Sequence, residues 1–173
     1  MADDILGWAP TALATTPARW FNLVQSVPAA LLIERPAPEA WAALECLQHL
    51  IDTERLSMPV RVQALLTGQP FPGFTPIQHA APQTVPIALA EEFSRLRQEN
   101  LALLARVTPA DLDRRALHAE YGMVSMSEFL HHWVGHDFMH TVQAERALLQ
   151  PCIRGCGPWR VNYTDHMAAG ATI

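Results

Sequence analysis

Prolines and turn residues divide this chain of 173 residues into four long segments whose apolar residues recur at helical spacing. Because helix positions three or four apart share one face, each segment predicts an amphipathic helix with one buried side. Ser125 followed by Glu128 is a capping box, which marks the start of the last helix. The predicted helices span 17–27, 39–66, 85–107 and 125–150. We therefore expect an all-α protein, most simply a four-helix bundle.

The prolines also predict where these helices begin, bend and end. Thr16-Pro17 fits a helix start, because threonine caps a helix and proline suits the first helical position. Pro59 should kink or end the second helix by removing a backbone bond. A long Pro-rich loop, 67–86, then joins the second and third helices, and such loops often act as functional lids. After Pro151 we expect a coil tail, 151–173, with Trp159 as its anchor.

Between the third and fourth helices, residues 114–124 read as irregular or weakly extended chain. No segment shows the convincing alternation of apolar and polar residues that a half-buried strand has. The length fits one domain, 1–173, with its core at about 17–150 and the tail outside it.

Composition narrows the class of protein. Half of the residues are hydrophobic and 17% are charged, as in a compact globular chain. A net charge of −5 without a Lys/Arg block argues against nucleic acid or an anionic membrane as partner. No apolar run would span a bilayer and the start lacks a basic signal-peptide region, so we expect a cytoplasmic protein with reduced cysteines.

Half of the eight histidines gather in the last predicted helix: His131, His132, His136 and His140. Those spaced four apart, from His132 to His140, share one face of the helix. Imidazoles stacked one turn apart can converge their ring nitrogens on a single ion. One helix then supplies part of a metal site, and a further ligand must come from elsewhere in the chain.

His49 is the best candidate for that ligand, because it alone among the remaining histidines lies in a long predicted helix. It stands between apolar residues, so we expect it at or near the core. Helix bundles build metal sites from facing helices in this way, and three histidines with an open position are typical of catalytic metal sites. From spacing alone, an ordinary core histidine and a solvated histidine-rich helix are equally good interpretations.

Two motifs give the chain a family resemblance. The stretch from Trp41 through His49-Leu-Ile-Asp-Thr-Glu54, and the later stretch Leu130–Gln143 with its H-x-x-x-H-x-x-Q pattern, are similar to the DinB/YfiT-like superfamily. The linking passage 109–125 is also similar to the family's approach to its last helix. The likeness covers most of residues 17–150.

The resemblance implies a four-helix bundle in which His49, His136 and His140 bind a divalent metal, commonly zinc or nickel, beside an open cavity. It also implies a homodimer. Characterised relatives include metal-dependent hydrolases and thiol S-transferases or isomerases that use low-molecular-weight thiols. Many members have no assigned reaction, and DNA polymerase activity is not implied.

Several polar neighbours would support such a site. Gln143 lies one turn past the last histidine and is placed to orient a ligand. His132 is expected at the pocket wall, while His131 should meet solvent. Asp52 and Asp137 could each accept a hydrogen bond from an imidazole N–H, but a position on the helix surface is the favoured interpretation for both.

Other kinds of functional site have weaker support in the sequence. His136-Asp-Phe-Met-His140 is similar to the H-E-x-x-H of zinc proteases, but aspartate reaches less far than glutamate and no strand accompanies it. Cys46 could approach the metal as a thiolate, although a small buried hydrophobe is the favoured interpretation. A second metal or redox site at Cys152, Cys156 and His166 lacks a matching ligand pair.

The aromatic residues Trp20, Trp41, Trp133 and Phe138 are expected in the core, with Trp133 as a candidate for the cavity mouth. The leading hypothesis is a metal-dependent enzyme acting on a small molecule, as a thiol S-transferase or hydrolase. Metal-bound water or thiolate would be the nucleophile. Glu54 and Asp52 are the nearest acids in the motif, and no clear general base emerges, which favours thiol transfer. The alternative is a non-catalytic bundle that binds a small molecule or serves dimerisation.

Overall fold

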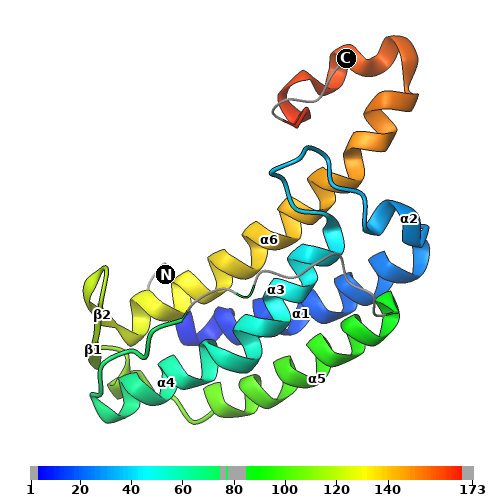
Figure 1. Ribbon diagram of the computed structural model, residues 1–173. Coiled ribbons are helices and arrows are strands. Elements are labelled where there is room, and N and C mark those ends of the chain that lie inside the picture. The colour runs from blue at the N-terminus through cyan, green and yellow to red at the C-terminus, as the bar shows by residue number, and fades with distance from the viewer. Residues whose placement is uncertain (1–3, 75–76, 78–84, 169–173) are drawn as a thin grey trace.

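Four long helices lie side by side in the computed structural model, which describes residues 4–74, 77 and 85–168 (Figure 1). They are α1 (Ile5–Ser26), α3 (Ala43–Leu56), α5 (Pro86–Leu104) and α6 (Met126–Gly155). The predicted all-α four-helix bundle is therefore confirmed. The shorter helical elements are α2 (Ala29–Leu32), α4 (Met58–Thr67) and the 3-10 segments η1 (Pro109–Asp111) and η2 (Gly157–His166). Of these helices, none is long and apolar enough to cross a membrane.

The first helix begins earlier than its Thr16-Pro17 signal predicts. Asp4 caps it by accepting a hydrogen bond from the Gly7 amide at 3.1 Å, and Pro17 lies inside the helix. A proline in this position lacks the N–H that would bond the carbonyl four residues back, at Leu13. That carbonyl instead accepts hydrogen bonds from the Thr16 hydroxyl and from the guanidinium of Arg97. The backbone hydrogen bond that Pro17 cannot form is thus replaced in part by a hydrogen bond from a side chain of another helix.

The second predicted helix is divided where its proline indicates. α3 ends at Leu56, and α4 begins at Met58 with Pro59 in its first turn, as the kink prediction requires. Most of the expected Pro-rich loop, residues 75–76 and 78–84, lies outside the described residues. Its first part is fixed to the strand that follows α5, because the Phe71 amide donates to the Leu117 carbonyl at 2.9 Å.

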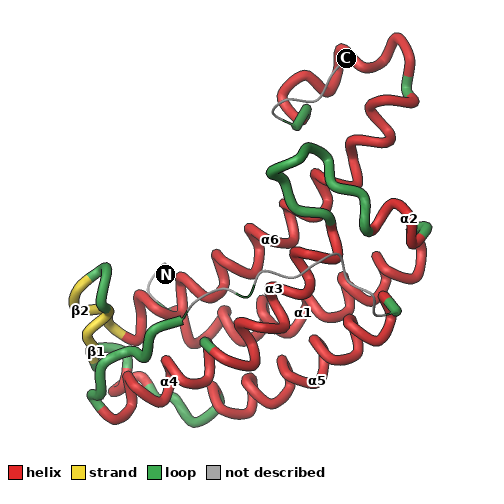
Figure 2. The backbone as a smooth tube through the Cα atoms, viewed as in Figure 1, coloured by secondary structure: helices red, strands yellow, loops and turns green. Residues whose placement is uncertain are grey.

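A short antiparallel hairpin occupies the stretch that was expected to be irregular or weakly extended before the last helix. β1 (Arg115–His118) pairs with β2 (Gly122–Ser125), with Arg115 opposite Ser125 and His118 opposite Gly122. Figure 2 shows it at one end of the bundle. Gly122 has a φ of +75°, a backbone conformation that favours glycine at this turn. Strands of four residues are too short to show a clear alternating pattern, which is why sequence reasoning missed them.

The C-terminal region is helical where a coil was predicted. α6 continues through Pro151 to Gly155, and η2 follows it. Trp159 is 69% exposed and anchors nothing. The anchor is the buried Gln150, whose amide nitrogen donates to the His166 carbonyl at 2.9 Å and whose oxygen accepts from the Ala168 amide at 3.0 Å. The end of the tail, 169–173, lies outside the described residues.

The core forms two apolar clusters along the bundle axis. One unites the first half of α1 with α4, the hairpin and the start of α6, and includes Ile5, Leu13 and Trp133. The other unites the second half of α1 with α3 and α5, and includes Trp20 and Phe93. Buried apolar residues therefore begin at Ile5, in the first turn of α1.

A buried polar layer lies where these clusters meet, and Arg97 is at its centre. The Arg97 guanidinium donates to Asp137 at 2.6 Å and to Glu54 at 3.0 Å, and both carboxylates are almost fully buried. Glu54 also accepts from the Trp133 indole at 2.8 Å and from the Asn100 amide at 2.9 Å. With its bonds to α1, Arg97 joins all four long helices.

Replacing Arg97 should destabilise the bundle strongly. Arg97→Met keeps an apolar stem but leaves Glu54 and Asp137 buried without their counter-charge, and removing one partner of a buried ion pair costs about 3–5 kcal/mol. Urea unfolding of the variant and wild type measures this cost. Arg19→Met, which breaks the exposed pair with Glu145, is the matched control and should cost about 1 kcal/mol or less. Equal losses in the two variants would contradict the central role of Arg97.

Candidate metal centre

Three histidines from two helices meet at one point on the bundle. His49 on α3 and His136 and His140 on α6 each present a ring nitrogen, and these nitrogens all lie within 4.8 Å of one another. The Nε2 atoms of His49 and His136 are 3.1 Å apart. His49 and His140 are buried and His136 is half-buried. The structure thus brings together the three residues that the sequence singled out.

The helices place these rings by simple periodicity. His136 and His140 are one turn apart on α6, and their ring centroids are 4.5 Å apart. His49 reaches them from the facing helix, with its centroid 4.5 Å from that of His140 and 5.2 Å from that of His136. No other group of three or more His, Cys, Asp or Glu side chains in the described part of the chain has such geometry.

The separation of the His49 and His136 Nε2 atoms fits two ligands of a single divalent ion. Ligands at 2.0–2.1 Å in a tetrahedral site stand roughly 3.3 Å from one another, close to the observed Nε2 separation. Neutral imidazoles suit several transition metals, including zinc and nickel. Three ligands would leave a fourth position open, which is the arrangement of catalytic sites.

Gln143 fixes the orientation of one of the three rings, as its position predicts. The Nδ1 atom of His140 is 2.9 Å from the Gln143 side-chain oxygen, which can only accept a hydrogen bond. Nδ1 therefore carries the proton, and the Nε2 lone pair is free for a metal. Trp41 stacks on the other side, with ring centroids 5.5 Å apart and planes 14° from parallel. His140 is thus held by both an amide and an aromatic ring.

Burial keeps two of the three histidines, His136 and His140, neutral. Burial, followed by the nearby His140 and His49, lowers the pKa of His136 to about 3. Burial also lowers the pKa of His140, although Gln143 and Asp137 partly offset it. The Nδ1 atom of His136 is buried with no hydrogen-bond partner. Neutral rings with free lone pairs are the form that binds a cation.

Asp137 and Asp52 are not helix-surface residues, contrary to the favoured interpretation. Asp137 is fully buried and both of its oxygens accept from Arg97, so it does not accept from an imidazole either. Asp52 is also buried. Glu54, the last residue of the early motif, belongs to the same ionic layer. Neither Asp137 nor Glu54 is placed as a base at the histidines, so the similarity to zinc proteases ends at the sequence.

A cavity of about 450 Å³ opens beside His49 and His136. His132 lines its wall, as predicted, and partial burial followed by the charge of Arg61 lowers its pKa. His131 faces away, is exposed and bonds the Ser127 carbonyl, also as predicted. Sequence reasoning missed Arg61 and His118 in this lining, because neither belongs to a motif.

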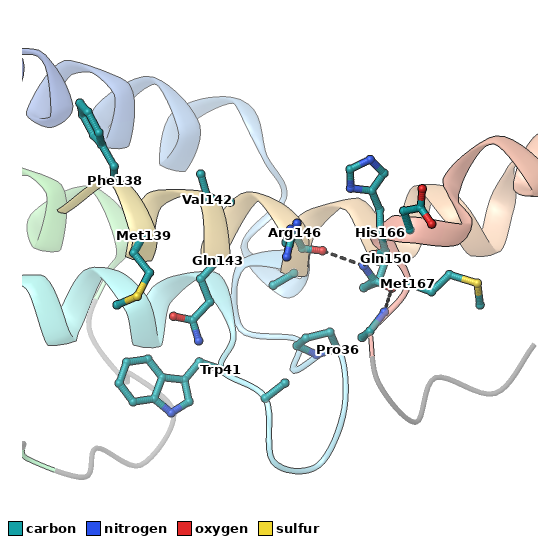
Figure 3. Close-up of a pocket in the computed structure, with 14 residues that line it drawn as sticks. Pro36, Trp41, Phe138, Met139, Val142, Gln143, Arg146, Gln150, His166 and Met167 are labelled. Carbon is teal, nitrogen blue, oxygen red and sulfur yellow. Dashed lines mark hydrogen bonds between the residues drawn. The ribbon is translucent and has the colours of Figure 1, made fainter. Parts of the chain in front are cut away.

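A second cavity has a volume of about 630 Å³. Trp41 and Gln143, which hold the His140 ring, both line it, and Figure 3 shows Phe138 and Met139 projecting from α6 nearby. Trp41 is half-buried and packs against the core cluster of α3 and α5 while it lines this cavity, whereas Phe138 is 42% exposed and the prediction that it lies in the core is wrong. Trp133 is buried in the core instead of at a cavity mouth. Two separate cavities thus lie near the cluster, one lined by His49 and His136 and the other by the two residues that contact His140.

The cysteines play no part in the histidine cluster. Cys46 is buried in the apolar core, where burial, followed by the charge of Glu45, raises the pKa of its thiol to about 12. It is therefore a protonated small hydrophobe at neutral pH, the favoured interpretation. Cys152 is exposed, and it forms no ligand group with Cys156 and His166 in the described ranges.

The lowered pKa of His136 predicts how metal-free protein responds to acid. The unfolded chain takes up this proton near pH 6.5 and the folded chain only near pH 3, so stability falls as pH decreases between these values. The loss from pH 7 to pH 5 should be on the order of 1–2 kcal/mol. Urea unfolding at both pH values, with a chelator, should show a smaller loss for His136→Gln. The exposed control His131→Gln should keep the wild-type loss, and an unchanged loss in His136→Gln would refute the assignment.

Comparison with known proteins places this fold among characterised families. The family model of the DinB superfamily matches residues 12–144. Among solved structures, the chain is similar to YfiT from Bacillus subtilis, described as a probable metal-dependent hydrolase with an unusual four-helix bundle topology. The two share 17% sequence identity and a TM-score of 0.73, over 85% of this chain and 87% of that one. No curated protein sequence gave a match.

Proposed function

This chain belongs to the DinB superfamily, and on that premise we propose that it is a divalent-metal-dependent enzyme acting on a small molecule. His49, His136 and His140 are the proposed ligands. The observation that carries the proposal is the convergence of their three ring nitrogens within 4.8 Å. The description of YfiT as a probable metal-dependent hydrolase supports the same class of function, although the low identity restricts that likeness to the fold.

Zinc and nickel are the proposed metals, because both accept an all-imidazole ligand set. When bound, such an ion supplies Lewis acidity that lowers the pKa of a water or thiol at its open position. The protein's own contribution is to keep the imidazoles neutral and oriented. The Gln143 oxygen holds the proton on Nδ1 of His140, and burial keeps His136 unprotonated. Both effects leave ring nitrogens available as ligands at neutral pH.

Between the two reactions considered, thiol S-transfer is the better match to these residues. Hydrolysis is helped by a general base near the nucleophile. Asp137 and Glu54 bind Arg97 in the core. A thiol requires no protein base once its pKa has been lowered. We therefore propose a thiol S-transferase that uses a low-molecular-weight thiol. A cytoplasmic location and a homodimer stay predictions.

Metal analysis of purified variants tests the proposed ligands. Wild type should hold about one zinc or nickel ion per chain, and His49→Ala, His136→Ala and His140→Ala should each lose most of it. Gln143→Leu should weaken the affinity roughly 10–100-fold, because partners that orient a ligand have effects of this size. His131→Ala and His132→Ala, on the same helix, are the matched controls and should retain the metal.

Two results would decide against the proposal in different ways. Equal and negligible metal in wild type and in His136→Ala would end the metal assignment. Full metal without turnover in thiol-transfer and hydrolysis screens would favour a non-catalytic small-molecule-binding protein instead.

A further inference from the structure

We infer that Arg61 makes the cavity beside the three histidines a binding site for a small organic acid, with the guanidinium pairing with the ligand's carboxylate. The inference rests on the proposed function only in taking this ligand to be the substrate. The binding itself follows from the described residues around Arg61. It adds a substrate class to the proposed metal-dependent reaction.

The cavity places Arg61 and the histidines around the same space. Its lining includes His49 and His136 on one part of the wall and Arg61 from α4 on another. Phe71 and Phe74, from the chain that follows α4, add apolar surface. A ligand in this volume can therefore contact the guanidinium and the aromatic rings while it reaches the proposed metal ligands.

Arg61 is a half-buried cation without a carboxylate partner in the described residues. Seven other arginines form ion pairs with Asp or Glu: Arg19, Arg35, Arg55, Arg95, Arg97, Arg114 and Arg154. The Nε atom of Arg61 is buried with no hydrogen-bond partner. Burial lowers its pKa, and no carboxylate counteracts that effect. Its observed neighbour is the Phe71 ring, with the guanidinium carbon 5.6 Å from the ring centroid.

An unpaired guanidinium in such a place has a physical cost that a ligand can offset. Burying a charge is unfavourable unless an opposite charge and hydrogen bonds compensate for lost water. The planar guanidinium matches a carboxylate with two parallel hydrogen bonds, which makes it selective for that group. The Phe71 ring holds one side of the guanidinium, so its orientation toward the cavity costs less on binding.

The other residues that line the cavity restrict the chemical class of the ligand further. Among the described residues of the lining, Glu120 is the only carboxylate; it is exposed and forms no ion pair with Arg61. Its negative charge disfavours ligands that carry several phosphates. Phe71 and Phe74 favour an acid with an apolar or aromatic body. The ligand class is therefore a compact monocarboxylic acid.

Titration with a matched pair of probes tests this inference. We would compare 3-phenylpropionate with its neutral amide, 3-phenylpropanamide, by ligand-observed NMR on zinc-loaded and chelator-treated protein. In chelator-treated wild type the acid should bind roughly tenfold more tightly than the amide, because a charge-assisted hydrogen bond is worth that much. Arg61→Met should reduce the ratio to within about twofold and leave amide binding unchanged.

Arg146→Met is the control, because Arg146 is an exposed arginine that lines the other cavity. It should keep the wild-type ratio. No measurable binding of the acid to wild type, equal binding of acid and amide, or a preference that survives Arg61→Met would each overturn the inference. Titration of chelator-treated protein tests the role of Arg61 in the absence of a metal. The metal assignment is tested separately, by metal analysis, so the two claims can fail independently.

Discussion

The buried Arg97 guanidinium is the interaction on which this bundle depends. Water cannot replace its hydrogen bonds, because Arg97 and its two carboxylate partners are almost completely buried. Its bonds reach the Leu13 carbonyl on α1, Glu54 on α3 and Asp137 on α6. An apolar contact could join the same helices, but it would tolerate rotation and sliding. Hydrogen bonds are directional, so the bonds of Arg97 to α1, α3 and α6 specify the rotation of each of these helices about its own axis.

That rotation also determines where the histidines point. Asp137 lies between His136 and His140, so turning Asp137 inward to Arg97 turns its two neighbours toward α3. Glu54 acts similarly on α3, five residues after His49. Glu54 and Asp137, one acid from each histidine motif, are therefore structural: they orient the helices that carry the ligands.

Periodicity was sufficient for the existence of the four long helices and for the histidine spacing, because both depend on residues close in sequence, but it misplaced the start of α1 and missed the helical C-terminal region. Placing His49 opposite His136 needed the family resemblance as well, since spacing within one helix says nothing about its partner. The roles of Asp137 and Glu54 were beyond sequence reasoning, because helix rotation depends on contacts with Arg97 on α5. The same holds for Arg61, because sequence reasoning could not show that it has no ion-pair partner among the described residues.

Anomalous diffraction from crystals of the full chain tests the central claim most directly. Data collected on both sides of the zinc and nickel absorption edges would locate and identify a bound ion. The account predicts one peak about 2.0–2.2 Å from a ring nitrogen of each of His49, His136 and His140. A metal bound elsewhere, or no peak between these rings in crystals grown with the ion, would contradict it.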